Sequence, residues 1–552
     1  REEVAIERNF YEDAAREAAT RQSRDLADQI SESIGKRTVF SSPSQNLALV
    51  VPHLEAVTPE DCLDALREIW VEPDETLLFV SGNAEIQDPD SAIRSTFDVS
   101  RSVPVAAPQD QSLTPFAYAD VAEPGPITDQ DFIEDLDVTQ IRFANQVRAN
   151  FKPTEFEDET IRIHARIGAG RITEPSPGLN YFADDMLNRG GLGVHSEDDL
   201  LRIFAGQEVS VNLYVDDDAF VMSGETNPDD LLPMLQLMQA YLVDPGFRPE
   251  ARIEFLRSLD DLYHEIDHTP EGIIWDRVES FLHREDSRVG YPDRKAMERF
   301  EIEDAKEWVL PEFKRGYLEL SVVGDFDLDS AIALVASTFG TLPERDRVKP
   351  AYLAEREVDL PDPGTTVFEF ESDIAKAIVD LHWPGEAIYE IDKSRGLVLL
   401  SSILSDRLRV EIREKLGDAY SPYASNHASD VWSDYGYLYA SVTTDPDKAL
   451  EVVAAVREIA AEMASGTSIT QDELERARNP LLVEFEESRR SNQYWLHNVL
   501  EASQEYPQRL DWARSFIERY EAFSLEEINA LAKTYLEPER AIVTIATPTQ
   551  ED

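Results

Sequence analysis

Cysteine is almost absent from the sequence. The one cysteine, Cys62, excludes an internal disulfide bond and a zinc ribbon built on cysteine thiolates. Cys62 lies in an amphipathic helical pattern, where a small buried residue is the simplest expectation. Long apolar runs are also absent, and no stretch reaches the roughly 18 residues of a membrane-spanning helix. The sequence begins with Arg1 and shows no export-signal pattern, so we expect a processed or truncated piece of a longer protein.

Positive charge is scarce as well. The chain has 52 lysine and arginine residues against 110 aspartate and glutamate residues, which gives a formal net charge of −58. Nucleic acid is therefore not an expected partner, because phosphate binding requires clustered cations. An acidic cavity would attract basic peptides, but a solvated surface adapted to salty surroundings is the simpler explanation.

One order of elements occurs three times along the chain: a helix with a capping signal, followed by a strand. The first copy begins at Thr58 and predicts a helix to about Trp70 and a buried strand over residues 76–83. The other copies occupy residues 301–325 and 524–546. A repeat of this length indicates duplicated domains rather than a solenoid. A chain of 552 residues is also too long for one hydrophobic core.

Hydrophobic periodicity predicts the remaining elements. Helices packed on antiparallel-rich mixed sheets indicate an α+β fold. Predicted helices cover residues 1–35, 179–189, 228–243, 470–503 and the segment before Arg413. Predicted strands cover residues 47–51, 141–151 (a hairpin), 160–169, 209–214, 219–223, 366–370, 377–383 and 436–442.

The segment from His264 to His268 matches H-E-x-x-H, a zinc-binding signature in which Glu265 would be the general base. Both histidines fall opposite the apolar stripe of their helix, on the face toward water. A zinc ion there would have no surrounding pocket, so two surface histidines are the better interpretation.

The acidic run Asp216, Asp217 and Asp218 is a candidate for calcium binding. It lacks the alternating ligand spacing of a calcium loop, so a turn at the end of a strand is the better interpretation.

Residues 408–421 predict an amphipathic helix, a glycine and then a strand. Arg413 and Tyr420 lie on either side of this break. A guanidinium group and a phenol beside an exposed turn are able to grip a peptide carbonyl or carboxylate. From the chemistry alone, a surface arginine and a packed tyrosine are the simpler alternative.

The chain resembles the pitrilysin/insulinase-type (inverzincin) zinc metallopeptidases in their bacterial long form. The resemblance rests on the hairpin motif at 143–148 with Lys-Pro-Thr at 152–154, on the closing strand that ends in Val-Val-Gly-Asp at 322–325, on Arg413 with Tyr420, and on the repeated domain size. It implies four homologous α+β domains, two in each half, that close like a clamshell around a chamber.

In this family the zinc-binding H-x-x-E-H helix belongs to the first domain. The equivalent helix of this chain carries Tyr181, Asp184 and Asp185 at the motif positions, and these side chains cannot form the His/His/Glu site. The resemblance therefore implies that this chain binds no metal, and that the chain lies C-terminal to the zinc-binding domain.

The resemblance also implies a division into domains. Residues 1–100 would be the C-terminal part of the second family domain, and residues 101–137 the linker between the halves. Residues 138–345 would be a third, metal-free domain, and residues 346–552 a fourth domain with the Arg413 and Tyr420 motif.

These assignments imply the substrate-binding part of a zinc metalloendopeptidase, inactive alone, whose Arg413 and Tyr420 hold the peptide and stabilise the oxyanion opposite the zinc. The expected partners are a peptide substrate and the N-terminal half of the same protein, which would bind the zinc. The alternative is a non-catalytic peptide-binding subunit that scaffolds an active paralogue, so a homo- or heterodimer stays open. An H-x-x-E-H upstream of Arg1 would distinguish the two. The resemblance favours a periplasmic or extracellular location.

Overall fold

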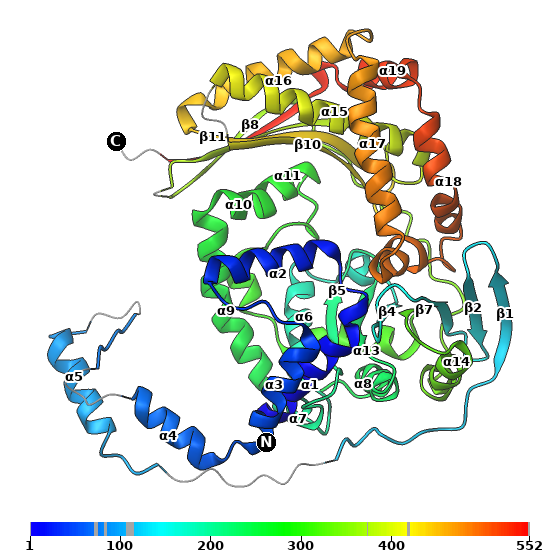
Figure 1. Ribbon diagram of the computed structural model, residues 1–552. Helices are drawn as coiled ribbons and strands as arrows, with labels where there is room; N and C mark the ends of the chain where they lie inside the picture. The colour runs from blue at the N-terminus through cyan, green and yellow to red at the C-terminus, as the bar shows by residue number, and fades with distance from the viewer. Residues whose placement is uncertain are drawn as a thin grey trace. The chain divides into compact units, whose positions relative to one another are not determined.

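The computed structural model describes residues 2–70, 76–81, 86–105, 115–372, 374–416 and 420–549, without the side chains of residues 413–416, 420 and 421. The chain forms two compact units (Figure 1). The first unit contains Arg1–Phe116 and Leu201–Gln207, and the second contains Ala117–Leu200 and Glu208–Asp552.

The regular elements that the structure describes in the first unit are all helices. The predicted helix over residues 1–35 is divided by a short 3-10 turn, η1 (Glu17–Ala19), and a break at residues 20–22. Cys62 is exposed, so the expectation of a buried cysteine is wrong. The helices are α1 (Glu2–Arg16), α2 (Ser23–Lys36), α3 (Pro43–Ala56), α4 (Pro59–Ile69) and α5 (Pro89–Ser100).

Two strand predictions in this unit are wrong. Residues 47–51 lie inside α3, because Ser42 and Gln45 form a capping box and Pro43 occupies the first turn. Residues 76–81 form no strand, and Leu77 and Phe79 are exposed. A strand needs a partner, and no sheet occurs in the described residues of the first unit. The capped helix predicted at Thr58 is confirmed as α4.

The second unit contains two mixed sheets. The first has seven strands in the order β1-β2-β3-β7-β4-β6-β5, with β3 and β7 parallel. Its strands are β1 (Ile127–Ile133), β2 (Val138–Phe143), β3 (Arg148–Pro153), β4 (Ile161–Ile167), β5 (Asn212–Val215), β6 (Phe220–Thr226) and β7 (Leu318–Gly324). β1 falls in the segment predicted to be linker. Six of its seven residues are exposed, so it lacks the apolar alternation that identifies a strand.

The hairpin between β2 and β3 shows how a local sequence determines its turn. Asn145 donates through its amide to the carbonyls of Phe339 and Leu342, and its side-chain oxygen accepts from the amide of Val147. Gln146 takes a positive φ of 71°. Asparagine therefore fixes the turn to the chain that follows α14, as expected for a residue that hydrogen-bonds its own turn.

The helices that accompany the strands of the first sheet in sequence lie mostly between β4 and β7. The capped helix α13 followed by β7 confirms the second copy of the helix–strand repeat. The helical elements are η3 (Gly170–Thr173), α6 (Leu179–Gly190), α7 (Glu197–Ile203), α8 (Leu231–Val243), α9 (Pro249–His268), α10 (Pro270–Ile273), the π-helix η4 (Ile274–Val278), α11 (Glu279–Leu282), α12 (Arg294–Met297), α13 (Ile302–Arg315), α14 (Leu328–Ser337) and η5 (Phe339–Thr341).

The second sheet has five strands in the order β10-β11-β9-β12-β8, with β8 and β12 parallel. Its strands are β8 (Gly364–Phe370), β9 (Ala377–Pro384), β10 (Tyr420–Ala428), β11 (Gly436–Thr444) and β12 (Ile542–Pro548). α19 followed by β12 confirms the third copy of the repeat. The helical elements are α15 (Ile391–Leu416), η6 (Pro446–Lys448), α16 (Ala449–Ala464), α17 (Gln471–Ser488), the π-helix η7 (Tyr494–Leu500), α18 (Gln508–Ala522), α19 (Leu525–Tyr535) and η8 (Pro538–Arg540).

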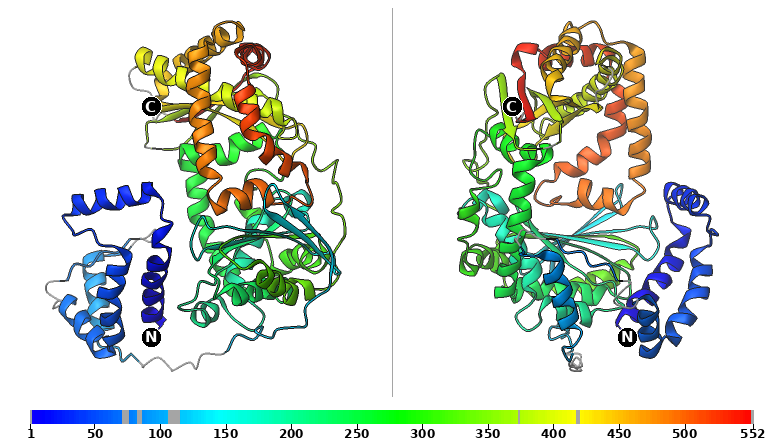
Figure 2. Two further views of the ribbon diagram at one scale, coloured as in Figure 1. Left: turned by 45° about the vertical axis from the view of Figure 1, so that its right-hand side comes forward. Right: turned by 90° about the vertical axis from the view of Figure 1, so that its left-hand side faces the viewer.

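Each sheet packs partly against helices that lie, in sequence, between the strands of the other sheet. Residues of α10, η4 and α11, such as Ile273 and Leu282, share a buried cluster with Tyr437 and Ile542 of the second sheet. Conversely, Trp495 and other residues of η7 share a cluster with strands of the first sheet. Figure 2 shows this from two sides, with the segment after α17 lying over the strands of the first sheet. The predicted α+β class with antiparallel-rich mixed sheets is confirmed.

Candidate functional site

The three residues at the expected zinc-motif positions lie on α6, and each has a different structural partner. The ring of Tyr181 stacks on Tyr291, with centroids 4.3 Å apart. Asp184 accepts a 2.7 Å hydrogen bond from the backbone amide of Val215 in β5. Asp185 forms a 2.8 Å ion pair with Arg189 one turn later.

Burial controls the charge of this region. It raises the pKa of Asp184 well above the ordinary value, and it raises the pKa of nearby Glu174 to about 7. Glu174 accepts a 2.7 Å hydrogen bond from the amide of Asn180 at the start of α6. In place of a ligand set, α6 therefore has one stacked phenol and carboxyl groups that bond to backbone amides or to an arginine.

The H-E-x-x-H segment lies at the end of α9. His264 is exposed, and its ring stacks on His268 with centroids 4.4 Å apart. A ring nitrogen of His268 lies 2.9 Å from the carbonyl oxygen of His264. Ile266 is the buried residue of this turn, so the apolar stripe and the two histidines face different directions.

The side chains of Arg413 and Tyr420 lie outside the described residues. Their backbone positions are clear: Arg413 is in the last turn of α15, and Tyr420 begins β10, paired with Thr443 of β11. β10 is an edge strand of the second sheet. Further along it, Tyr423 is 46% exposed and packs edge-to-face on Tyr439. An edge strand with an exposed aromatic residue is a suitable surface for an extended peptide.

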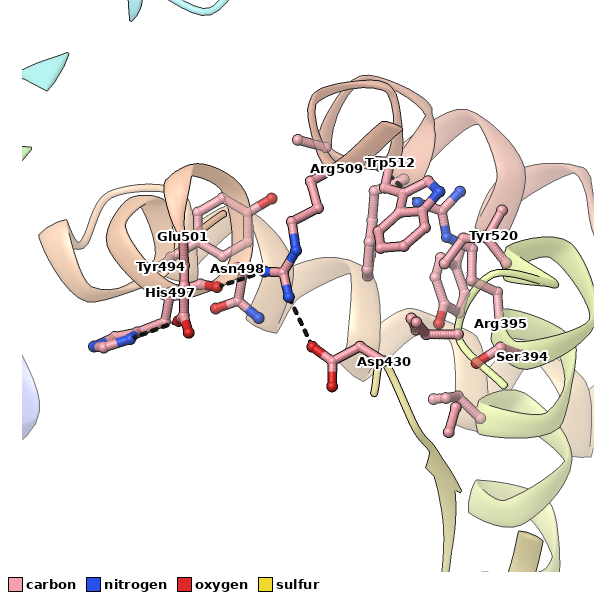
Figure 3. A pocket seen from close by; sticks show the side chains of 16 residues that line it. Ser394, Arg395, Asp430, Tyr494, His497, Asn498, Glu501, Arg509, Trp512 and Tyr520 are labelled. Carbon is pink, nitrogen blue, oxygen red and sulfur yellow. Dashed lines mark hydrogen bonds and ion pairs between the residues drawn. The ribbon is translucent and has the colours of Figure 1, made fainter. Parts of the chain in front are cut away.

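A pocket of about 480 Å³ lies among the start of α15, η7, α18 and the end of β10 (Figure 3). Arg509 lies at its centre, donating to the carboxylate of Asp430 at 2.8 Å and to the carbonyl of His497 at 3.2 Å. Trp512 and Tyr520 form part of the aromatic wall. The pocket thus combines a cation with aromatic surface.

Two residues of the pocket wall belong to a group that sequence reasoning missed. His497 and Glu501 of the η7 segment lie beside His164 of β4, and one potential ligand atom from each lies within 4.8 Å of the other two. His164 is buried, which lowers its pKa to about 4, so its imidazole is neutral near pH 7. The available signal was His164 itself, a polar residue in the strand predicted over 160–169.

The acidic run at 216–218 does form the turn between β5 and β6, as predicted. Its third residue, however, is the centre of a buried ion cluster. Asp218 accepts hydrogen bonds from Arg166, from Lys349 at 3.3 Å and from Arg356 at 3.0 Å. Burial alone would raise the pKa of Asp218, but the attraction of these three cations outweighs it and holds the pKa well below the ordinary value.

Comparison with known proteins identifies the fold of this arrangement. Residues 299–481 match the family described as Peptidase M16 inactive domain. The periplasmic protease PqqL from Escherichia coli superposes with a TM-score of 0.67 at 16% identity, over 99% of this chain and 60% of that chain. The two-sheet architecture is therefore that of a clamshell half of an M16 peptidase.

The sequence comparison finds similar proteins among the proteases. The chain is 22% identical over 446 residues to the chloroplastic stromal processing peptidase of Pisum sativum, covering 71% of this chain and 35% of that protein. It is 25% identical over 236 residues to an uncharacterized zinc protease of Rickettsia felis, covering 41% of this chain and 53% of that protein.

The chain thus spans about a third of its first curated relative. It is similar in sequence to zinc proteases, and residues 299–481 match the M16 inactive domain. The resemblance that the sequence motifs indicated is confirmed. No described helix has both the length and the apolar character needed to cross a membrane.

Proposed function

We propose that this chain is the non-catalytic, substrate-binding C-terminal portion of a zinc metalloendopeptidase that hydrolyses peptides or unfolded polypeptides in a closed chamber. The observation that carries the proposal is the set of side chains that α6 has at the motif positions within a peptidase fold. Tyr181, Asp184 and Asp185 occupy the motif positions, and each is engaged by its own structural partner. The match to the inactive domain supports the same conclusion.

In this proposal the zinc is bound by an N-terminal domain of the same protein, where it activates water and polarises the scissile carbonyl. Residues 138–345 and 346–552 are the third and fourth family domains, residues 1–100 are the end of the second, and residues 101–137 link the halves. The protein is exported, as is the periplasmic protease that shares its fold.

The substrate-binding surface in this proposal is the beginning of β10. Among the strands that the structure describes, β10 pairs with β11 alone, so its other edge is able to bind an extended peptide by strand addition. Tyr423 supplies exposed aromatic surface next to it. Arg413, in the last turn of α15, and Tyr420, the first residue of β10, bind the peptide carbonyl and stabilise the oxyanion that forms on it.

Peptide binding by the purified chain tests the proposal. We expect labelled, unstructured basic peptides to bind without being cleaved, more weakly at high salt because the chain carries a net charge of −58. Tyr423→Ala is expected to weaken binding about 10-fold, the effect of truncating one exposed aromatic contact. Val367→Ala is the control, because Val367 is exposed on β8 at the opposite edge of the same sheet.

Chelator-sensitive hydrolysis by this chain alone would contradict its assignment as non-catalytic. Equal binding by the Tyr423 and Val367 variants would contradict the placement of the peptide on β10.

A further inference from the structure

We propose that His164, His497 and Glu501 form a binding site for a divalent metal ion such as zinc. The bound ion would join β4 to the η7 segment. This site is separate from the zinc motif of the peptidase family. Its residues come from β4 and from the π-helical segment η7 with the residue that follows it, not from α6, and it does not depend on the function proposed above.

The donor set suits such a metal. Two imidazoles and one carboxylate are ligands that zinc binds at about 2.0–2.2 Å, which places tetrahedral ligand atoms about 3.4 Å apart. The imidazole Nδ1 of His497 lies 3.2 Å from Oε2 of Glu501, so these two atoms already have that separation. The three ligand atoms lie within 4.8 Å of one another, so side-chain adjustments of at most about 1.4 Å bring them to that separation.

An unsatisfied buried group points to a ligand at this place. His164 is 2% exposed, and its Nε2 has no hydrogen-bond partner among the described residues. A buried polar atom without a partner costs free energy, so such atoms usually bind a water molecule or an ion. The His164 ring stands nearly perpendicular to that of His497, with centroids 5.1 Å apart, and this arrangement lets the two rings share a metal.

The surroundings hold the carboxylate in place. Oε1 of Glu501 accepts a 2.6 Å hydrogen bond from Arg166, while Oε2 faces His497. Arg166 also pairs with Asp216 and Asp218, so its positive charge is compensated before a metal ion arrives. Outer partners of this kind orient metal ligands and raise the affinity of a site.

The local backbone is unusual at the same place. η7 is a π-helix, and the amide of Glu501 donates to the carbonyl of Leu496 five residues earlier. Wide turns of this type occur frequently at functional sites. This turn brings His497 and Glu501 to the same side of the segment, toward β4.

Zinc binding to the purified chain tests the site. After removal of metal by a chelator, zinc affinity is measured by competition with a chromophoric chelator, and cobalt is used to record the absorption of the bound ion. We expect one high-affinity zinc per chain. His497→Ala is expected to lower the affinity by about 100-fold or more, since even the loss of an outer partner costs up to that factor.

Two controls make the result specific. His264→Ala removes a histidine from the H-E-x-x-H segment on α9 and is expected to leave the affinity unchanged. Because the side chain of His497 is 40% exposed, its variant is expected to fold, and its melting temperature without metal checks this. Zinc should raise the melting temperature of the wild-type chain but not that of the His497 variant, because the metal joins two separate elements.

The proposal is overturned if the wild-type chain binds no zinc, or if His497→Ala binds it as tightly as the wild type. Loss of binding in His264→Ala would place the metal on α9 instead.

Discussion

Asp218→Asn is the most informative stability variant of this protein. The side chain of Asp218 is 2% exposed, and Arg166, Lys349 and Arg356 donate to it with side chains that are 4–9% exposed. Asparagine preserves the shape of the side chain but removes its charge. Three buried cations then lose their common counter-ion.

The magnitude follows from what each cation retains. Arg166 keeps ion pairs with Asp216 and Glu501, and Lys349 keeps Glu505 at 3.4 Å. Arg356 keeps only carbonyl and phenol partners among the contacts that the structure describes. Removal of one member of a buried pair typically costs about 3–5 kcal/mol, and we expect a loss of about 4 kcal/mol in the free energy of unfolding.

Urea unfolding followed by tryptophan fluorescence measures this loss. The neighbouring variant Asp216→Asn is the matched control, because Asp216 is 41% exposed and, among the described residues, forms an ion pair with one cation, Arg166, at 3.1 Å. A partly exposed pair is worth less than about 1 kcal/mol. The double variant Asp218→Asn with Lys349→Met should recover part of the loss, since one uncompensated cation is removed. Equal effects of the two single variants would refute the reasoning.

Two further predictions concern the second sheet. Burial raises the pKa of Asp380 to about 6, so the folded state holds its proton more tightly than the unfolded state, and stability falls as pH rises from about 4 to about 6. This rise in the pKa of Asp380 corresponds to about 3 kcal/mol in the free energy of unfolding. Asp380→Asn should therefore be more stable than wild type at pH 7.5 by up to that amount, and the difference should vanish below pH ~4 in urea titrations. A difference independent of pH would contradict this. On the proposed function, Tyr420→Phe in the protease that contains this chain should lower kcat about 100-fold, the value of one oxyanion donor, with zinc content unchanged. Normal turnover in that variant would remove Tyr420 from the mechanism.

The sequence predicts the fold of the second unit well because its signals are local. Capping boxes mark α17 and α19, and alternating residues mark β4 and β11. The predictions fail where local pattern and long-range pairing diverge. Residues 47–51 alternate like a strand, but the capping box at Ser42 starts a helix that includes them. β1 is an exposed edge strand, so its sequence lacks the apolar alternation that would predict it.

The candidate site shows the same division. The family motif places Tyr181, Asp184 and Asp185 on one helix from sequence alone, and α6 is that helix. The cluster around His164 was not predictable in this way, because more than 300 residues separate His164 from Glu501 and only the packing of η7 on the first sheet brings them together. Asp218 was correctly assigned to a turn, but its three cationic partners come from distant parts of the chain.

The exchange of helices between the two sheets restricts how this protein is able to move. Separating the sheets would expose the apolar clusters that α10, α11 and η7 share with them, and would break the ion pairs of Asp218 with Lys349 and Arg356. Both changes cost free energy, so residues 117–200 and 208–552 are expected to move as one rigid body. If the chain opens and closes around a substrate, the hinge has to lie outside these residues.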